Sequence, residues 1–422
     1  MHPIYDIVGI GFGPSNLALA IALTEHNEQA ETPVTAVFLE RQDTFGWHRG
    51  MLLDDATMQV SFLKDLVTMR NPASRFSFLC YLRDRGRLID FVNHKNLFPL
   101  RVEFHDYFEW AAAQVDDLVT YGAEAVGVQA VQDDLFEVTT ATGDVYHARN
   151  LVFATGLRPT VPDGVELSDR VWHNSEFLHR VGELADPKRC VVVGAGQSAA
   201  EAVAYLHREF PDAEVCSVFS RYGYSPADDS SFANRIFDPE AVNHYYDAPD
   251  AVKQRLMDYH RNTNYSVVDV DLIAQLYRTV YQEKVLGRQR LKMMNLTRLV
   301  AVEESASGAR AVIQSLVTGE QELLDADLVL LATGYDEAAP VLGALDETCA
   351  RDENGRLVVG RDYRVQSPLR GGIYLQGGTE HSHGITSSLL SNVAVRSGEI
   401  LASVLTNTAV LTNTPVPVLA TA

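Results

Sequence analysis

The sequence contains two glycine-rich turns that together decide its fold: Gly9-Ile10-Gly11-Phe12-Gly13-Pro14-Ser15-Asn16 and Gly194-Ala195-Gly196-Gln197-Ser198-Ala199-Ala200-Glu201. Each turn directly follows a short apolar run, residues 5–8 in the first case and 190–193 in the second. A strand that passes through such a turn into a helix brings backbone N–H groups and a helix N-terminus to a diphosphate. One turn alone is weak evidence, because small residues at a strand–helix junction often serve packing only. Two of them predict two dinucleotide-binding units in one chain.

The two units differ at the end of their second strand. Glu40 ends the strand predicted over residues 34–40, and a carboxylate there accepts hydrogen bonds from a ribose diol, which suits FAD or NAD. The strand over residues 214–220 ends without a carboxylate and is followed by Arg221, whose guanidinium can bind a 2′-phosphate. The second unit therefore favours NADP over NAD. The plainer alternatives are that Glu40 is an ordinary surface residue and that Arg221 is an exposed residue at the rim of the site.

The composition is that of an ordinary globular enzyme. The 422 residues are 46% hydrophobic and 22% charged, enough for two or three domains with sizeable cores. The formal net charge of -21 argues against nucleic acid or an anionic membrane as a partner. No stretch approaches the ~18 apolar residues of a membrane span, and no targeting segment is evident, so a cytoplasmic location is expected.

The cysteines and histidines predict neither a disulfide framework nor a metal site. The four cysteines stand far apart, and His381 and His383 lack a third ligand of suitable spacing. A flavin disulfide reductase needs a close cysteine pair, so that reaction is disfavoured. Transfer of electrons to oxygen needs no protein nucleophile, because the flavin carries the chemistry. No side chain is therefore assigned as a catalytic nucleophile, acid or base.

The predicted fold class is α/β, with two Rossmann-like domains for FAD and NADPH and a small, mostly helical substrate-binding insertion. The expected FAD domain is discontinuous, the NADPH domain is divided by the insertion, and the last residues are expected to be a disordered tail. Helices are expected over residues 14–26, 102–114, 249–260, 270–283 and 388–404. The repeated Ala-Thr-Gly endings at 154–156 and 332–334 indicate either chain crossings between the domains or simple tight turns. The expected boundaries are 1–165 and 336–405 for the FAD domain, 166–227 and 291–335 for the NADPH domain, 228–290 for the insertion, and 406–422 for the tail.

Several motifs resemble a known family, the N-hydroxylating flavin monooxygenases that act on the side-chain amine of L-ornithine or L-lysine. The resemblance runs from Tyr5 to about Leu401, and it is closest to the ornithine hydroxylases of actinobacterial type. Arg235 departs from the pattern, which usually has an acid or an amide there. The motifs are the two glycine turns, Trp47-His48, Met58-Gln-Val-Ser-Phe-Leu-Lys-Asp65, Ser231-Phe-Ala-Asn-Arg-Ile-Phe-Asp-Pro239, Asn262-Thr-Asn-Tyr-Ser-Val-Val268, Ala332-Thr-Gly-Tyr335 and His383-Gly-Ile-Thr-Ser-Ser-Leu-Leu-Ser391.

The resemblance implies roles for individual residues. Lys64 is expected to bind the carboxylate of the amino acid substrate, Asn234 its α-amino acid end, and Asn264 to lie between the nicotinamide and the side-chain amine, with Ser391 near that amine. Gln197 and Ser198 are expected to meet the NADPH phosphates, and Arg221 lies one position from the usual phosphate-binding arginine. The remaining residues expected to bind a cofactor are Gly9, Gly11, Gly13, Pro14, Glu40, Trp47, His48, Gln59, Val126, Gly194, Gly196, Ser388, Leu389 and Leu390.

The same residues also have plainer interpretations. Lys64 follows an apolar run, and a buried ammonium needs a partner, which is either a substrate carboxylate or the adjacent Asp65. Asn234 and Asn264, taken alone, are typical turn or cap residues. His48 beside Trp47 is more typical of loop packing against FAD than of catalysis.

The expected function is hydroxylation of L-ornithine to N5-hydroxyornithine, for siderophore or related biosynthesis, through a flavin C(4a)-hydroperoxide, with FAD, NADPH and molecular oxygen. The same chemistry on L-lysine or a small diamine is the alternative within this class. A flavoprotein redox sensor or electron-transfer protein is the alternative outside it. The expected partner is a small amino acid substrate, without nucleic acid or membrane, and a homo-oligomer is left open.

Overall fold

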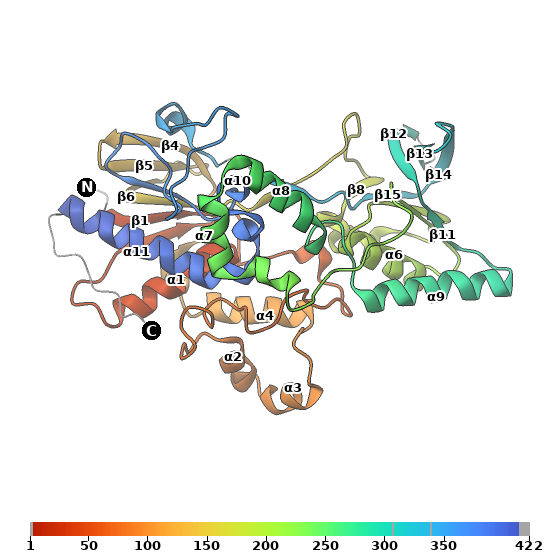
Figure 1. Ribbon diagram of the computed structural model, residues 1–422, viewed down its shortest axis with the longest axis horizontal. Helices are drawn as coiled ribbons and strands as arrows, with labels where there is room; N and C mark the ends of the chain where they lie inside the picture. Colours follow the sequence, from red (N-terminus) through yellow and green to blue (C-terminus); the bar gives the residue numbers. More distant parts are fainter. Residues whose placement is uncertain (1–2, 306–307, 338–339, 413–422) are drawn as a thin grey trace.

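Each glycine turn lies at the carboxyl end of a buried parallel strand in the computed structural model, which describes residues 3–305, 308–337 and 340–412. The two strands are β1 (Ile4–Ile10) and β9 (Arg189–Val193). They belong to separate sheets, and each sheet is the centre of one lobe (Figure 1). The prediction of an α/β fold with two Rossmann-like units is confirmed.

The first lobe is built on a seven-stranded sheet in which β1 is central. β1 pairs in parallel with its neighbours on both sides, and the far edge of the sheet is an antiparallel meander that the sequence did not predict. The sheet runs β3 (Val119–Thr120), β2 (Ala36–Leu39), β1, β6 (Val145–Phe153), β5 (Leu135–Thr140) and β4 (Ala125–Gln132), with β17 (Gly372–Leu375) also paired to β6.

Helices cover the first sheet on the face seen below it in Figure 1. An aromatic cluster around Phe78, Phe104 and Tyr107 is almost fully buried and fixes α4 and α2 onto the sheet. Burial of each such ring stabilises the fold by about 1.5–3 kcal/mol. The helices of this lobe are α1 (Pro14–Asn27), α2 (Phe78–Asp84), α3 (Leu88–His94), α4 (Arg101–Ala112), α10 (Glu380–His383) and α11 (Val393–Thr412).

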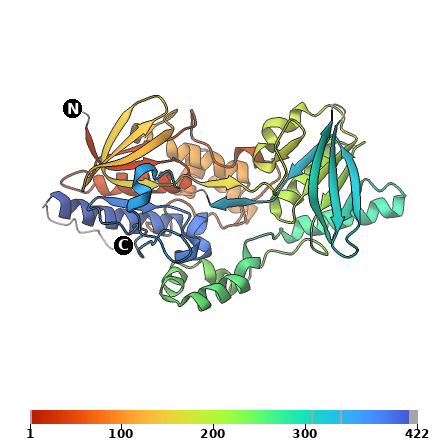
Figure 2. The same cartoon turned by 90° about the horizontal axis from the view of Figure 1, so that it is seen from above.

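The second lobe has a five-stranded parallel sheet and a smaller antiparallel one. Seen from above, the small sheet stands at the side of this lobe (Figure 2). The parallel sheet runs β11 (Leu291–Met294), β10 (Glu214–Val218), β9, β15 (Leu328–Leu331) and β8 (Val171–His173). The small sheet, also not predicted, comprises β12 (Thr297–Ser305), β13 (Gly308–Ser315) and β14 (Gln321–Ala326).

Residues 228–290 are mostly helical, as predicted, but their last helix belongs with the second lobe. α7 (Pro239–Asp247) and α8 (Asp250–His260) lie beside α10 of the first lobe (Figure 1). α9 (Val270–Leu286) packs its apolar face against α6 (Gln197–Glu209) and joins the core of the second lobe.

The two lobes are joined directly after the repeated Ala-Thr-Gly sequences. β7 (Leu157–Pro159) directly follows the sequence at 154–156, and β16 (Tyr335–Glu337) directly follows the sequence at 332–334. These two strands pair antiparallel. The repeated endings therefore mark chain crossings, rather than simple tight turns.

The C-terminal helix differs from the prediction at both ends. Ser388 ends one short 3-10 turn, η8 (Ile385–Ser388), Leu389 is extended, and Leu390 begins another, η9 (Leu390–Asn392), so α11 starts only at Val393. The helix also continues to Thr412, so the tail predicted from Thr406 is wrong for residues 406–412. Leu405 and Ala409 are buried, and this packing overrides the weak helical period of the sequence. The rest of the predicted tail, 413–422, lies outside the described residues.

Both glycine turns need glycine because their backbones press against a neighbouring strand end. A Cβ on Gly11, which has a φ of +84°, would lie 2.4 Å from the carbonyl oxygen of Ala154. A Cβ on Gly194, with a φ of +145°, would lie 2.2 Å from that of Ala332. The two turns are thus packed in the same way, each against one Ala-Thr-Gly sequence.

We predict that Gly194→Ala destabilises the protein by about 2–4 kcal/mol, because it combines a backbone clash with a strained conformation. Gly182→Ala is the matched control, since no heavy atom lies within 4 Å of its added Cβ. The control should change the free energy of unfolding, measured by urea denaturation, by less than about 0.5 kcal/mol. Equal stabilities of the two variants would show that the close packing of the turn is not required.

Candidate active site

A cavity of about 1930 Å³ is lined by residues of both lobes and of the segment 227–271. Sites for one small ligand usually enclose about 300–1,000 Å³, so this cavity has room for more than one. Its walls include both glycine-turn regions, through Gly11, Gly13 and Gln197, and the segment Ser388 to Ser391. The cavity therefore joins the two predicted dinucleotide sites and the predicted substrate site.

The first turn fits the diphosphate of FAD. Gly13 is the N-cap of α1, no side chain caps this helix, and a Cβ on Gly13 would point into open space. The N–H groups of the first turn, Pro14 excepted, and the positive end of the helix dipole are thus directed at the cavity.

Glu40 stands at the end of β2 and lines the same part of the cavity. Its carboxylate is nearly buried and accepts hydrogen bonds from the backbone N–H of Phe12 (2.6 Å) and of Gln42 (2.9 Å). A carboxylate has about four acceptor positions, so two remain for a ribose diol. Glu40 both orders the glycine turn and can bind the ribose.

A buried arginine that the sequence did not point to lies behind this turn. Arg396 is 2% exposed and donates hydrogen bonds to the carbonyl oxygens of Thr386 (3.0 Å) and Ser387 (2.7 Å) and to Ser15 Oγ (3.3 Å). Among residues 3–305, 308–337 and 340–412, no carboxylate lies within ion-pair distance of it. Burial lowers the pKa of Arg396. An anion beside Ser15, such as the diphosphate, would compensate this charge.

The second turn resembles the first in its open helix end. Gly196 is the N-cap of α6 and no side chain caps that helix either. Gln197, the first helical residue, lines the cavity. This arrangement fits a second dinucleotide diphosphate, with Gln197 beside it.

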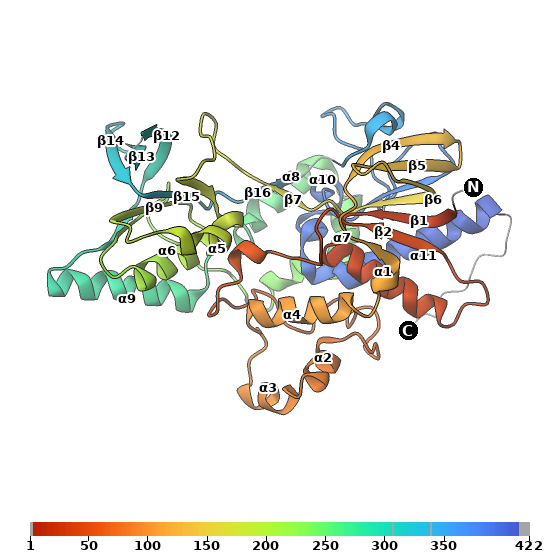
Figure 3. The same ribbon diagram turned by 180° about the vertical axis from the view of Figure 1, so that it is seen from behind.

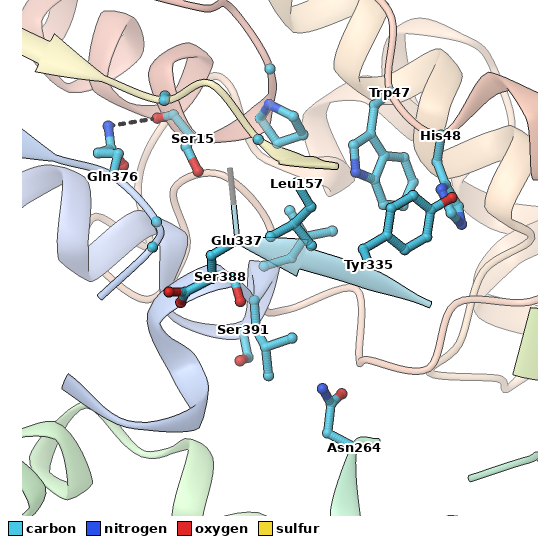
Figure 4. Close-up of a pocket in the computed structure, with 18 of the residues that line it drawn as sticks. Ser15, Trp47, His48, Leu157, Asn264, Tyr335, Glu337, Gln376, Ser388 and Ser391 are labelled. Carbon is cyan, nitrogen blue, oxygen red and sulfur yellow. Dashed lines mark hydrogen bonds between the residues drawn. The ribbon is translucent and has the colours of Figure 1, made fainter. Parts of the chain in front are cut away.

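Aromatic side chains form one wall of the cavity near the lobe junction (Figure 4). The rings of Trp47 and His48 lie 5.5 Å apart, and His48 lies 6.3 Å from Tyr335. Burial, assisted by the positive charge of Arg101, lowers the pKa of His48 to about 3, so this imidazole is neutral. A neutral ring beside two tilted aromatic rings suits packing against a flavin better than proton transfer.

Lys64 supplies a cation where the first lobe meets the segment 227–237. Its ammonium lies 5.6 Å from the centre of the Phe237 ring, and burial lowers its pKa while Asp238 opposes this shift. The alternative of an ion pair with Asp65 is wrong. Asp65 is buried and instead accepts hydrogen bonds from the backbone N–H of Val67, Thr68 and Phe78. Within the described ranges, Lys64 has no carboxylate at ion-pair distance, so its charge is available to a ligand.

Asn234, Asn264 and Ser391 also line the cavity. The Asn234 side-chain nitrogen donates to the carbonyl oxygens of Asp229 (2.6 Å) and Ser230 (3.3 Å), which leaves its oxygen to accept from an ammonium group. Within the described part of the chain, Ser391 Oγ is buried without a hydrogen-bond partner. The amide of Asn264 points toward the segment that carries Ser391 (Figure 4). A buried hydroxyl of this kind can hydrogen-bond a group bound in the cavity.

The structure brings most of the predicted residues to the cavity and leaves a few elsewhere. Gly9 in β1, Gly194 and Gly196 in the second turn, and Ser198 in α6 are not among the lining residues. Val126 is half exposed on β4, next to the lining residue Ala125. Arg221 does not line the cavity and donates to Ser225 Oγ and the carbonyl oxygen of Ser266. Contact of these residues with a cofactor stays a prediction.

The sequence reasoning missed Arg396, Phe237 as a neighbour of Lys64, and the ring of Tyr335 as part of the wall. Tyr335 and Phe237 lie inside two of the motifs quoted above, and those motifs are the local sequence signal that could have identified them. Arg396 lies in a helix with no local motif, and only tertiary packing shows that it is buried.

Among residues 3–305, 308–337 and 340–412, no group of three histidine, cysteine, aspartate or glutamate side chains could hold a metal ion. No helix in those ranges is long and apolar enough to cross a membrane.

Two dinucleotide-binding lobes around one shared cavity define a flavin- and nicotinamide-dependent oxidoreductase. Comparison with known proteins makes the assignment narrower. Residues 3–337 match the family model of L-lysine 6-monooxygenase/L-ornithine 5-monooxygenase. An L-ornithine N(5)-monooxygenase of Burkholderia cepacia is 41% identical over 402 residues, which cover 90% of each chain.

Solved structures agree with this match. The ornithine N-hydroxylase of Kutzneria sp. 744, described with reduced FAD, NADP+ and L-ornithine, is 47% identical and has a TM-score of 0.91, with 95% of this chain and 99% of that chain covered. The L-lysine 6-monooxygenase of Pseudomonas syringae is 33% identical, with a TM-score of 0.84 and coverage of 96% and 99%. The present chain belongs to the L-lysine 6-monooxygenase/L-ornithine 5-monooxygenase family. It is an NADPH-dependent flavin N-hydroxylating monooxygenase that uses FAD, NADPH and molecular oxygen.

A buried histidine, in the same motif as the Ser388–Ser391 segment, is expected to make stability depend on pH. His383 is 1% exposed, stacks on Tyr363 at 4.1 Å and contacts Ser382 Oγ and the carbonyl oxygen of Arg361. Burial lowers its pKa to about 3, from an unfolded value near 6.5. Between these two pKa values the unfolded chain binds a proton at this residue and the folded chain does not. The contribution of His383 to the free energy of unfolding is therefore complete above pH ~6.5 and is lost as the pH falls.

We predict that lowering the pH from 6.5 to 5 decreases the free energy of unfolding by about 2 kcal/mol through protonation of His383 in the unfolded chain, at about 1.4 kcal/mol per pH unit. His383→Gln, which keeps a donor for the Arg361 carbonyl, should abolish this part of the pH dependence in urea denaturation at the two pH values. His94→Gln, on the exposed helix α3, is the control. An unchanged pH dependence in His383→Gln would contradict the assignment of a neutral, buried ring.

Proposed function

We propose that this chain hydroxylates the side-chain amine of L-ornithine to give N5-hydroxyornithine, for a siderophore or a related hydroxylamine-derived metabolite. The observation that carries the proposal is the half-buried ammonium of Lys64, which faces the cavity without a carboxylate partner among the described residues. An amino acid carboxylate is the partner that such a charge requires. The higher identity to an ornithine N-hydroxylase (47%) than to an L-lysine 6-monooxygenase (33%) favours ornithine.

We also propose FAD in the first lobe and NADPH in the second, with the domain boundaries given above except that α9 joins the NADPH domain and the FAD domain continues to Thr412. Two features support the placement. The carboxylate of Glu40 stands beside the first turn and suits a ribose diol, whereas the second turn has no equivalent carboxylate at the end of β10. Arg396 adds a positive charge beside Ser15 of the first turn.

Bound FAD supplies the chemistry that activates oxygen, and the side chains position the reactants. Lys64 and Asn234 fix the α-carboxylate and the α-ammonium group at the segment 227–237, which leaves the side chain of the substrate to extend into the cavity. Asn264 and Ser391 are neutral, so they hold the terminal amine without favouring its charged form. The amine must lose its proton to act as a nucleophile, and activity should therefore rise toward alkaline pH.

The direct test is a panel of substrates with the FAD-loaded protein and NADPH. Oxygen uptake and hydroxylamine formation are measured with L-ornithine, L-lysine, putrescine and no amine. Ornithine should give the highest kcat/KM for hydroxylamine, by about 10-fold or more, because one methylene group changes recognition by 1–3 kcal/mol. A preference for lysine or putrescine would reassign the substrate. Oxidation of NADPH without hydroxylamine from any amine would contradict the proposal.

We predict that Lys64→Met raises the KM for L-ornithine by about 10- to 100-fold, the 1.5–3 kcal/mol typical of a hydrogen bond to a charged group. Hydride transfer should be affected less, so that NADPH oxidation continues with release of peroxide. Lys284→Met, on the exposed surface of α9, is the control and should leave KM unchanged. An unchanged KM in Lys64→Met would remove Lys64 from the substrate site.

A further inference from the structure

A buried ion pair connects the two lobes below the cavity. Arg101, the first residue of α4, and Glu201 of α6 are each 6% exposed. Two hydrogen bonds join them, from Nη2 to Oε1 at 2.7 Å and from Nη1 to Oε2 at 2.9 Å. Figure 3 shows α4 beneath the lobe junction and α6 in the neighbouring lobe. A bidentate pair of this kind fixes orientation as well as distance.

The same carboxylate also holds Gln197. The Gln197 side-chain nitrogen donates to Glu201 Oε1 at 2.9 Å, and its oxygen accepts from the backbone N–H of Asp269 at 2.8 Å. Asp269 is the N-cap of α9, where its own side chain accepts from the N–H of Asp271. The contacts thus run from Arg101 through Glu201 and Gln197 to Asp269, and they connect the first lobe to the starts of two helices, α6 and α9, of the second.

Additional hydrogen bonds offset the cost of burying the two charges of this ion pair. Arg101 Nη1 also donates to the carbonyl oxygen of Met51 at 2.8 Å, and Glu201 accepts from Arg101 and from Gln197. Buried ion pairs seldom add stability when compared with apolar side chains of similar size, but they are demanding in geometry. A positional role therefore explains this pair better than a contribution to stability.

We propose that Arg101 and Glu201 are positioning residues for NADPH, which act by holding Gln197 at the start of α6. Gln197 is the member of this network that lines the cavity, directly after the N-cap of a helix whose N-terminus fits a diphosphate. Arg101 also neutralises a carboxylate that lies one helical turn from that anion site. The inference rests on the proposed function only in taking NADPH as the nucleotide of the second lobe.

The charge of Glu201 gives the two single variants different consequences. Arg101→Met leaves an unpaired carboxylate near the diphosphate site, so it should weaken binding of NADP+ through both repulsion and loss of position. Glu201→Met removes the acceptor for Gln197 but also removes the negative charge. Arg101→Met should therefore weaken NADP+ binding more than Glu201→Met does.

The deciding experiment uses the double variant Arg101→Met/Glu201→Met in the FAD-loaded protein. Thermal unfolding and the Kd for NADP+, measured by fluorescence titration, are compared with those of the wild type. Each single variant should lower the midpoint temperature of unfolding by about 5 °C or more. The double variant, with two methionines in place of the ion pair, should recover most of that loss. The Kd for NADP+ should stay about five- to tenfold higher in the double variant, because Gln197 has lost its anchor. Recovery of affinity together with stability would overturn the proposal and leave the pair a structural role alone.

A matched control is an exposed ion pair between the same lobes, Arg208 with Asp55 at 2.6 Å. The double variant Arg208→Met/Asp55→Asn removes a lobe-to-lobe pair but does not touch Gln197, so the Kd for NADP+ should not change. An equal loss of affinity in this control would show that any link between the lobes has the same effect, and would contradict a specific role for Gln197.

Gln197→Leu tests the same proposal if the buried variants fail to fold. It leaves the ion pair intact and should weaken NADP+ binding by about five- to tenfold with the affinity for FAD unchanged. An unchanged Kd for NADP+ would contradict the proposal. A wild-type protein that binds no NADP+ would instead contradict the proposed function, so the two failures can be told apart.

Discussion

The structure depends on two places where the backbone approaches another backbone more closely than a side chain permits. At Gly11 and at Gly194 the turn after a parallel strand lies against the carbonyl of an Ala-Thr-Gly sequence. The same sequences lead into β7 and β16, which pair and join the lobes. Each contact therefore fixes a turn for a dinucleotide and, through the following strand, the connection between the two lobes.

The charge distribution explains how a protein of net charge -21 can hold two anionic cofactors. Both α1 and α6 begin at a glycine without a side-chain cap, so backbone N–H groups remain for a ligand. Behind the first turn lies the guanidinium of Arg396, which has no carboxylate at ion-pair distance among the described residues. Behind the second, Arg101 neutralises Glu201. Local donors and dipoles decide binding here, because charges on the distant surface are screened by salt.

The sequence could predict those parts of the molecule whose signal is local. The glycine turns, the strands before them and Glu40 lie within short motifs, and the structure places them as predicted, with Glu40 lining the cavity. The antiparallel sheets were not predicted, because their strands carry no motif. Arg101 and Glu201 are 100 residues apart, and no local pattern indicates that they meet. The length of α11 was underestimated because burial of Leu405 and Ala409 is a tertiary effect.

The central claim is that one cavity holds a flavin dinucleotide and a nicotinamide dinucleotide at the same time. Equilibrium dialysis of the protein with labelled FAD and NADP+, separately and together, measures this most directly. The account predicts one molecule of each per chain when both are present, with neither displacing the other. Mutual displacement, or a single dinucleotide bound per chain at saturation, would show that the two glycine turns do not form two working sites.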